Sequence, residues 1–150
     1  MNRIVLALVL AALSPLCAAQ APAVLGKCIV QNMSPKDRSD LARWVFVSMA
    51  AHPETKQFTN VPPDARDETS RAVGVLFTHL MTDVCAKEVQ EAARAGGPPV
   101  VPSTIQFLTQ IGVQELMTNR DVLGTLSSFS RFADRERIDR AARPDQSQQH

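Results

Sequence analysis

The segment that decides the fold spans residues 34–50 and reads SPKDRSDLARWVFVSMA. Ser34 suits the position before a helix, where its hydroxyl accepts a hydrogen bond from an otherwise unpaired backbone amide. Pro35 fits the first helical position, and Asp37 completes a capping box while facing the positive end of the helix. The segment therefore predicts a helix that ends before Pro53, because the residue preceding a proline avoids helical angles.

Apolar residues of this segment recur at helical spacing, so one face of the predicted helix is apolar. The stripe is wide enough for us to expect a well-buried helix. Trp44 lies inside the stripe and is expected in the core, although a tryptophan there could instead anchor a binding partner. The positions of the stripe are Leu41, Trp44, Val45, Ser48 and Met49, widened by Phe46 and Val47.

Three further stretches show helical patterns bounded by capping or breaking residues. The longest would measure about 48 Å if straight, which is long for a domain with a radius of gyration of about 14 Å. We therefore expect either a bend or break in it, at Gly74 or beyond Cys85, or a helix that crosses the whole molecule. Ser103 and Asp121 are the expected caps of the two following helices. The predicted helices cover residues 35–51, 64–95, 103–119 and 121–133, the last extending as far as residue 143.

Four helical segments joined by short connections predict an all-α fold, a single-domain bundle of about four to five helices with one disulfide. Residues 20–27 are small and apolar, and we expect a loose leader there. The Gln- and Ser-rich residues 144–150 are expected to be a disordered tail. The helical domain is thus predicted to span residues 20–143.

The first nineteen residues have the pattern of a secretory signal peptide. Arg3 supplies a basic start, residues 4–13 are an unbroken apolar run, and Ala19 ends a stretch of small side chains suited to cleavage. The run is too short to span a bilayer permanently. We therefore predict that residues 1–19 are removed, that Gln20 becomes the first residue, and that the protein is periplasmic or secreted with no stable membrane span after processing.

Three cysteines are encoded, and Cys17 lies inside the predicted signal. Cys17 could be a lipid-anchor site, but such processing needs a small residue where Leu16 stands. Cys28 and Cys85 remain. In an oxidising compartment an even pair most simply forms one disulfide, which the chain-entropy model values at about 4 kcal/mol at most. Two unpaired buried thiols are the alternative, and a metal site is not expected because neither cysteine has a C-x-x-C neighbour.

Charge and motifs exclude several classes of function. Basic residues number 16 and acidic residues 15, and removal of Arg3 balances them. A balanced chain gives no reason to expect nucleic acid or an anionic membrane as a partner. The sequence lacks the G-x-S-x-G nucleophile elbow, the H-E-x-x-H zinc motif, the Walker loop and the dinucleotide-binding glycine pattern. From motifs we therefore predict no cofactor, no metal site and no catalytic residue.

His79 and Asp83 are the best local candidates for chemistry. Four residues apart on a helix, they share a face on which the carboxylate would orient the imidazole. A metal or catalytic site needs at least one more group, and His52 and Glu54 are the obvious recruits. The alternative is an ordinary surface histidine with a hydrogen-bond partner, while the segment around Pro53 indicates a helix stop with a polar turn.

Aromatic and basic residues near the end of the chain leave two more alternatives open. Phe107, Phe129 and Phe132 either line a groove for an apolar ligand or pack as ordinary helix contacts. The arginines beyond residue 130 either bind an acidic partner or pair with the acidic residues that alternate with them. The pattern favours the second reading in both cases, since packing and self-pairing need no partner.

A resemblance is carried by caps and core positions along the chain. These are Cys28, NMSPKDR at 32–38, LARWVF at 41–46, MAAHPE at 49–54, Cys85 and LMTNRDV at 116–122. They resemble small uncharacterised exported helical proteins of Gram-negative bacteria. That resemblance implies a periplasmic or secreted helical domain and assigns no activity and no functional residue. In overall make-up the chain is also similar to the small disulfide-bonded helical immunity proteins of bacterial toxin systems.

These observations favour a non-enzymatic exported protein that binds another macromolecule, for instance a second periplasmic protein, or a small apolar ligand, or that has an accessory role in the envelope. A toxin-immunity-type inhibitor is one alternative. An enzyme whose site forms only in three dimensions around His79 and Asp83 is another, and a structural envelope component is a third. A deep polar pocket at His79 would favour the enzyme, whereas an exposed apolar patch would favour a binder.

Removal of the signal peptide and formation of the disulfide together predict the mass of the exported protein. Mass spectrometry is expected to find Gln20 at its N-terminus and a mass lower by two hydrogen atoms than that of the dithiol form, because one disulfide joins Cys28 to Cys85. Thiols that alkylate in the native, unreduced protein would contradict the bridge, and an N-terminus at Met1 would contradict processing.

Overall fold

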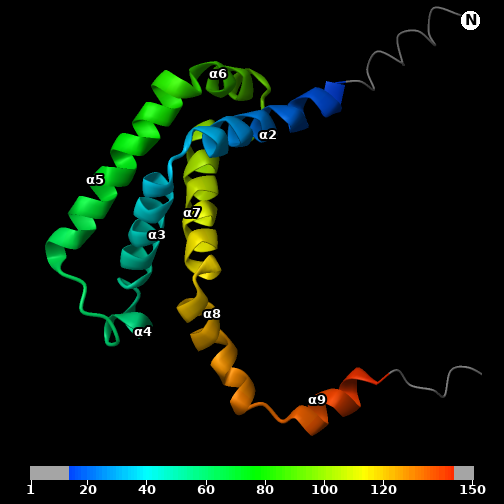
Figure 1. Ribbon diagram of the computed structural model, residues 1–150. Helices are drawn as coiled ribbons and strands as arrows, with labels where there is room; N and C mark the ends of the chain where they lie inside the picture. The colour runs from blue at the N-terminus through cyan, green and yellow to red at the C-terminus, as the bar shows by residue number, and fades with distance from the viewer. Residues whose placement is uncertain (1–13, 144–150) are drawn as a thin grey trace, which may run out of the picture. The chain divides into compact units, whose positions relative to one another are not determined.

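The computed structural model describes residues 14–143, with side chains from Pro22 onward (Figure 1). This part of the chain contains eight α-helices, one π-helix and one 3-10 helix, and it contains no strand, so the predicted all-α class is confirmed. The helices are α2 (Ser14–Asn32), α3 (Pro35–Met49), α4 (Pro53–Lys56), α5 (Pro63–His79), the π-helix η1 (Leu80–Val84), α6 (Ala86–Arg94), α7 (Val100–Thr118), α8 (Arg120–Ser127), the 3-10 helix η2 (Ser128–Arg131) and α9 (Arg135–Ala142).

The number of helices exceeds the predicted four to five for local reasons. Residues 20–27 are not a loose leader but part of α2. Leu25 and Ile29 of α2 are buried, and their packing in the core stabilises the helix. α4 is a single turn that follows Pro53. The stretch 64–95 is divided by η1, and the last predicted helix is divided into α8, η2 and α9.

The predicted signal cleavage point, after Ala19, falls inside α2. Pro22 therefore lies in the helix interior, where a proline lacks the amide that would pair with the preceding turn. The signal prediction for residues 1–13 and the predicted disordered tail, residues 144–150, lie outside the described residues.

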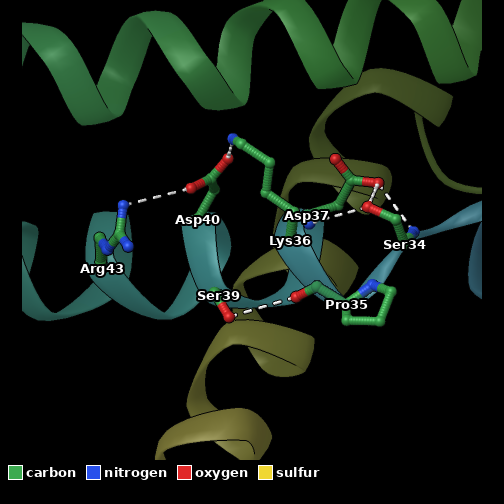
Figure 2. Close-up of polar contacts among 7 residues, drawn as sticks. All are labelled: Ser34, Pro35, Lys36, Asp37, Ser39, Asp40 and Arg43. Carbon is green, nitrogen blue, oxygen red and sulfur yellow. Dashed lines mark hydrogen bonds and ion pairs between the residues drawn. The ribbon is translucent and has the colours of Figure 1, made fainter.

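The predicted start of α3 is confirmed in detail (Figure 2). The Asp37 amide donates to Ser34 Oγ at 3.2 Å, and the Ser34 amide donates to Asp37 Oδ2 at 2.8 Å. Along the next turn Asp40 forms an ion pair with Lys36, and a second at 3.5 Å with Arg43. Reciprocal capping satisfies two amides that the first turn leaves unpaired, so the helix begins at a defined residue.

The long helical stretch bends at η1, so both expected positions are wrong: Gly74 lies in the unbroken interior of α5, and η1 precedes Cys85. The Cys85 amide donates to Leu80 O at 2.9 Å, and Cys85 itself leaves the helical region at φ −112° and ψ 24°. The extra residue in this turn lets α6 set off in a new direction.

Two predicted helix caps are wrong by a few residues. α7 begins at Val100, and Ser103 lies inside it, donating from its hydroxyl to Pro99 O at 2.9 Å. α8 is capped by Asn119, whose Oδ1 accepts from the amides of Asp121 and Val122 at 2.9 and 3.2 Å. Asp121 thus lies in the first turn, where its charge still favours the helix N-terminus.

The described chain folds as two compact units, one ending at Leu116 and the other beginning at Met117, and each is described by itself. In the first unit α3 packs between α5 and α7, and α2 packs along α6 (Figure 1). Side chains from α2, α3, η1 and α7 meet in the core. Its most deeply buried members are Ile29, Leu41, Leu80, Cys85 and Leu108.

The buried strip of α3 is narrower than its apolar stripe. Leu41 and Val45 are buried, and Trp44 packs against the core while remaining partly exposed. Phe46 and Met49 are 50% and 59% exposed, which corrects the expectation that this helix is buried across its whole stripe. Periodicity identifies the apolar face of a helix, but the neighbouring helices decide how much of that face they cover.

The second unit contains α8, η2 and α9, and none of its described residues is buried. Phe129 and Phe132 are 69% and 85% exposed, so the expected core packing of these two phenylalanines is wrong for this unit. No helix among residues 14–143 is both long enough and apolar enough to cross a membrane.

The close crossing of α7 and α3 makes Gly112 a sensitive position. A Cβ at Gly112 would lie 2.7 Å from Val45 Cγ2 and 2.8 Å from the backbone oxygen of Leu41, so Gly112→Ala is expected to lower the free energy of unfolding by about 1–3 kcal/mol. Gly74→Ala, in α5 with nothing within 4 Å, is expected to raise it by about 0.5–1 kcal/mol. Urea denaturation measures both, and effects of the same sign would contradict this packing.

Candidate functional site

The structure brings His79 and Asp83 together as their spacing predicts. His79 Nδ1 lies 2.9 Å from Asp83 Oδ2, and the Thr82 hydroxyl donates to Asp83 Oδ1 at 2.9 Å. The hydrogen bond with His79, followed by that from Thr82, lowers the pKa of the Asp83 carboxyl below its ordinary value. Both side chains are exposed, at 59% and 63%, so solvent screens their attraction.

The third group that hydrogen-bonds this pair is Thr82, whereas the two proposed recruits, His52 and Glu54, lie in the turn at α4. His52 caps α4, its Nδ1 accepting from the Glu54 amide at 3.2 Å, so both proposed recruits serve a local turn. Neither His79 nor Asp83 lines any of the three cavities described below. Within the described residues the arrangement is that of an exposed, hydrogen-bonded pair on the surface of the helix.

Cys28 and Cys85 meet as predicted. Their sulfur atoms lie 1.99 Å apart, the distance of a disulfide bond, and their Cα atoms lie 6.1 Å apart. Cys28 comes from α2, whereas Cys85 stands at the junction of η1 and α6 and is 0% exposed. The link therefore ties the first described helix to the point where the long helical stretch bends.

Glu88 stands beside this link and was not identified from the sequence. One of its carboxylate oxygens and the two sulfur atoms lie within 4.8 Å of one another, which makes this the one group of three such donors close enough to share a metal ion among the described residues. The available signal was the C-x-x-E spacing from Cys85, which places both residues on one turn at the start of α6. While the sulfurs are bonded to each other they offer no thiolate.

One cavity lies in the first unit, between α2, the loop before α7 and α7 itself, and both apolar and polar side chains line it. Its volume is about 310 Å³. Gly26 admits the ring of Phe107, since a Cβ there would lie 3.3 Å from the ring. The buried Thr104 hydroxyl already donates a hydrogen bond to Val100 O at 2.8 Å, so it does not need a ligand in the cavity to accept one. We call this space the α2–α7 cavity; it is lined by Pro22, Leu25, Gly26, Ile29, Ala92, Gly97, Pro98, Val100, Ser103, Thr104, Gln106, Phe107 and Gln110.

Of the three phenylalanines considered for a ligand groove, only Phe107 lines the α2–α7 cavity. Phe129 and Phe132 belong to the second unit and line none of the three cavities. Sequence reasoning missed Gly26 and Ala92, because two small residues far apart in the chain carry no pattern that links them.

The first unit contains two other cavities. One of about 320 Å³ between α3 and α5 has charged walls, but its Asp40 already pairs with Lys36 and Arg43. The other, about 220 Å³, lies beside Trp44, Phe77 and Leu108. No family model, curated protein or solved structure matches this chain.

The pKa of Asp83 provides a test of the His79 contact. His79→Ala is expected to raise this pKa toward the ordinary value of 3.8, because the largest cause of its lowering is removed. A lowered carboxyl pKa stabilises the fold above the unfolded-state pKa, and this contribution is lost as the pH falls through the folded-state value. Carbon NMR of the carboxyl group measures the pKa.

The same variant tests whether His79 has a structural or catalytic task. Because both side chains are exposed and solvent screens their attraction, His79→Ala is expected to lower the urea midpoint only slightly at pH 7. A clear fall in the midpoint, or an Asp83 pKa that does not move, would contradict the description of this pair as a surface hydrogen bond.

Proposed function

We propose that this chain is an exported, disulfide-linked helical protein that acts by binding and not by catalysis, and that it holds a small apolar molecule in the α2–α7 cavity. The observation that carries the proposal is the lining of that cavity, to which α2 contributes Leu25 and Ile29 and α7 contributes Phe107. Burial of apolar surface would provide the affinity.

The size of the cavity supports a ligand of a few carbon rings or a short acyl chain. An engineered apolar cavity of about 150 Å³ binds benzene, and ordinary ligand pockets begin near 300 Å³. At about 310 Å³ the α2–α7 cavity lies at the lower end of that range. The exposed amides of Gln106 and Gln110, one turn apart on α7, are available to orient a polar group at the rim.

The arrangement of the cavity wall supports a role for the disulfide. α2 supplies four of the lining residues, and Cys28 lies between two of them, Gly26 and Ile29. The link to Cys85 holds α2 against η1 and α6, and α6 supplies the lining residue Ala92. A pre-formed wall reduces the ordering cost that a ligand would otherwise meet.

Export is part of the proposal and rests on the sequence of the first nineteen residues. Pro22 adds a structural argument. In the uncleaved chain Pro22 stands in the interior of α2, where it removes a backbone hydrogen bond. Cleavage after Ala19 would make Pro22 the third residue, in the first helical turn, where a proline amide has no helical partner to lose. The likeness to small exported proteins of Gram-negative bacteria belongs to this proposal.

A second candidate function is the binding of a protein partner, of which a toxin-immunity-type inhibitor is an instance. The observation that favours it is the exposure of apolar side chains in the second unit. Leu126 is 50% exposed there, and Phe129 and Phe132 are exposed still further. Large exposed aromatics are typical of protein interfaces.

Naphthalene, a two-ring hydrocarbon with its own fluorescence, tests the proposed ligand site. The full chain is expected to bind one molecule saturably, and Ala92→Leu, which would fill the α2–α7 cavity, is expected to weaken binding at least about tenfold. Ala93→Leu is the matched control, because Ala93 is exposed on the same helix and does not line the cavity.

Thermal unfolding of both variants confirms that each is folded before binding is compared. Equal affinities for Ala92→Leu and the unmodified chain, or no saturable binding to either, would contradict the ligand site. In that case a protein captured through the second unit becomes the better account, and Phe132→Ser would be the variant that weakens it.

A further inference from the structure

The group formed by Cys28, Cys85 and Glu88 is independent of the α2–α7 cavity and has a chemistry of its own. Cys28 comes from α2, Cys85 from the start of α6, and Glu88 from the first turn of α6. Their two sulfurs and one carboxylate oxygen lie within 4.8 Å of one another. Cys85 is buried, while Cys28 and Glu88 are partly exposed, so the group opens to solvent on one side.

Reduction of the link by two molecules of a small thiol such as glutathione, which leave joined as glutathione disulfide, would turn this group into a set of metal ligands. Zinc binds thiolate sulfur at about 2.3 Å and carboxylate oxygen at about 2.0–2.2 Å, so donors around one tetrahedral ion lie about 3.5–4 Å apart. The three donor atoms lie within 4.8 Å of one another, so movements of side chains alone bring the separated sulfurs and the carboxylate oxygen to such distances. No movement of a helix is required, because a Cα separation of 6.1 Å accommodates both arrangements.

A polar neighbour supports the sulfur of Cys28. Asn32 lies one turn further along α2, and its Nδ2 donates to Cys28 O at 2.9 Å and lies 3.8 Å from Cys28 Sγ, within hydrogen-bond range of sulfur. Donors that hold a ligand in place in this way tune metal sites from outside the coordination shell. Thiolates select zinc, cadmium and cobalt over calcium and magnesium.

We propose that the dithiol form of this protein binds one thiophilic divalent cation, Zn²⁺ in the first instance, through Cys28, Cys85 and Glu88. Water takes the fourth position on the side open to solvent. Formation of the disulfide releases the ion, so the link is a redox-controlled metal site as well as a structural bond. The two cysteines come from helices far apart in the chain, so their spacing in the sequence does not indicate this site.

The release step balances with a small disulfide such as glutathione disulfide as oxidant. The two protein thiolates form the Cys28–Cys85 bond and give up two electrons, which break the sulfur–sulfur bond of glutathione disulfide. Two glutathione thiolates leave. The cation departs with its charge unchanged, and the Glu88 carboxylate stays ionised.

Cobalt is the probe, since Co²⁺ bound to thiolates shows charge-transfer and visible bands that report its geometry. The full chain, reduced with a non-thiol reductant, is expected to bind one Co²⁺ per chain with a tetrahedral spectrum, and Zn²⁺ is expected to displace it. Cys28→Ser is expected to abolish the charge-transfer band. Glu88→Gln, which leaves both cysteines in place, is expected to raise the Kd for Co²⁺ at least about tenfold.

Glu91→Gln is the matched control for Glu88→Gln, because Glu91 lies one turn further on α6 and pairs with Lys87 at 3.9 Å, outside the metal group. It is expected to bind Co²⁺ like the unmodified chain. Absence of the charge-transfer band, two chains per ion, or an unchanged Kd for Glu88→Gln would overturn the proposal. Retention of the ion after glutathione disulfide has closed the link would overturn the release step.

Discussion

The contact between Cys28 and Cys85 is the constraint on which the first unit depends. It joins α2, which begins the described chain, to the bend between η1 and α6, more than fifty residues later. Two consequences follow from that one contact. α2 becomes one wall of the α2–α7 cavity, and the Cys28 sulfur comes within reach of Glu88, which neither sequence position would suggest.

Packing on the other side of the unit depends on a close approach of backbones. Gly112 of α7 lies against the Leu41 carbonyl and the Val45 side chain of α3, and no larger residue fits there. The same crossing buries Leu41 and Leu108 completely or nearly so. A tight crossing on one side and a covalent link on the other leave the α2–α7 cavity between two fixed elements, which is the condition under which an apolar space persists without collapsing.

Much of the fold was predictable because its signals are local. The Ser34–Asp37 cap, the all-α class and the pairing of Cys28 with Cys85 follow from capping chemistry, residue composition and cysteine number. The errors also have physical causes. Residues 20–27, which were expected to be a loose leader, are helical because Leu25 packs into the core. Asn119 caps α8 in place of Asp121, and the sequence does not distinguish the two because asparagine and aspartate suit a cap about equally well.

The sequence by itself determined where α3 begins, that the described chain is helical and, with Cys17 set aside, which two cysteines pair, since each of these depends on neighbours in the chain or on simple counting. It left open whether the long stretch bends. Only the tertiary structure decided that the bend is a π-helical turn at Leu80–Val84, that Gly26 and Ala92 share a cavity with Phe107, and that Glu88 joins the cysteines. The physical reason is that cavities and ligand sets are properties of distances between helices, and helical periodicity says which face is apolar without saying what that face meets.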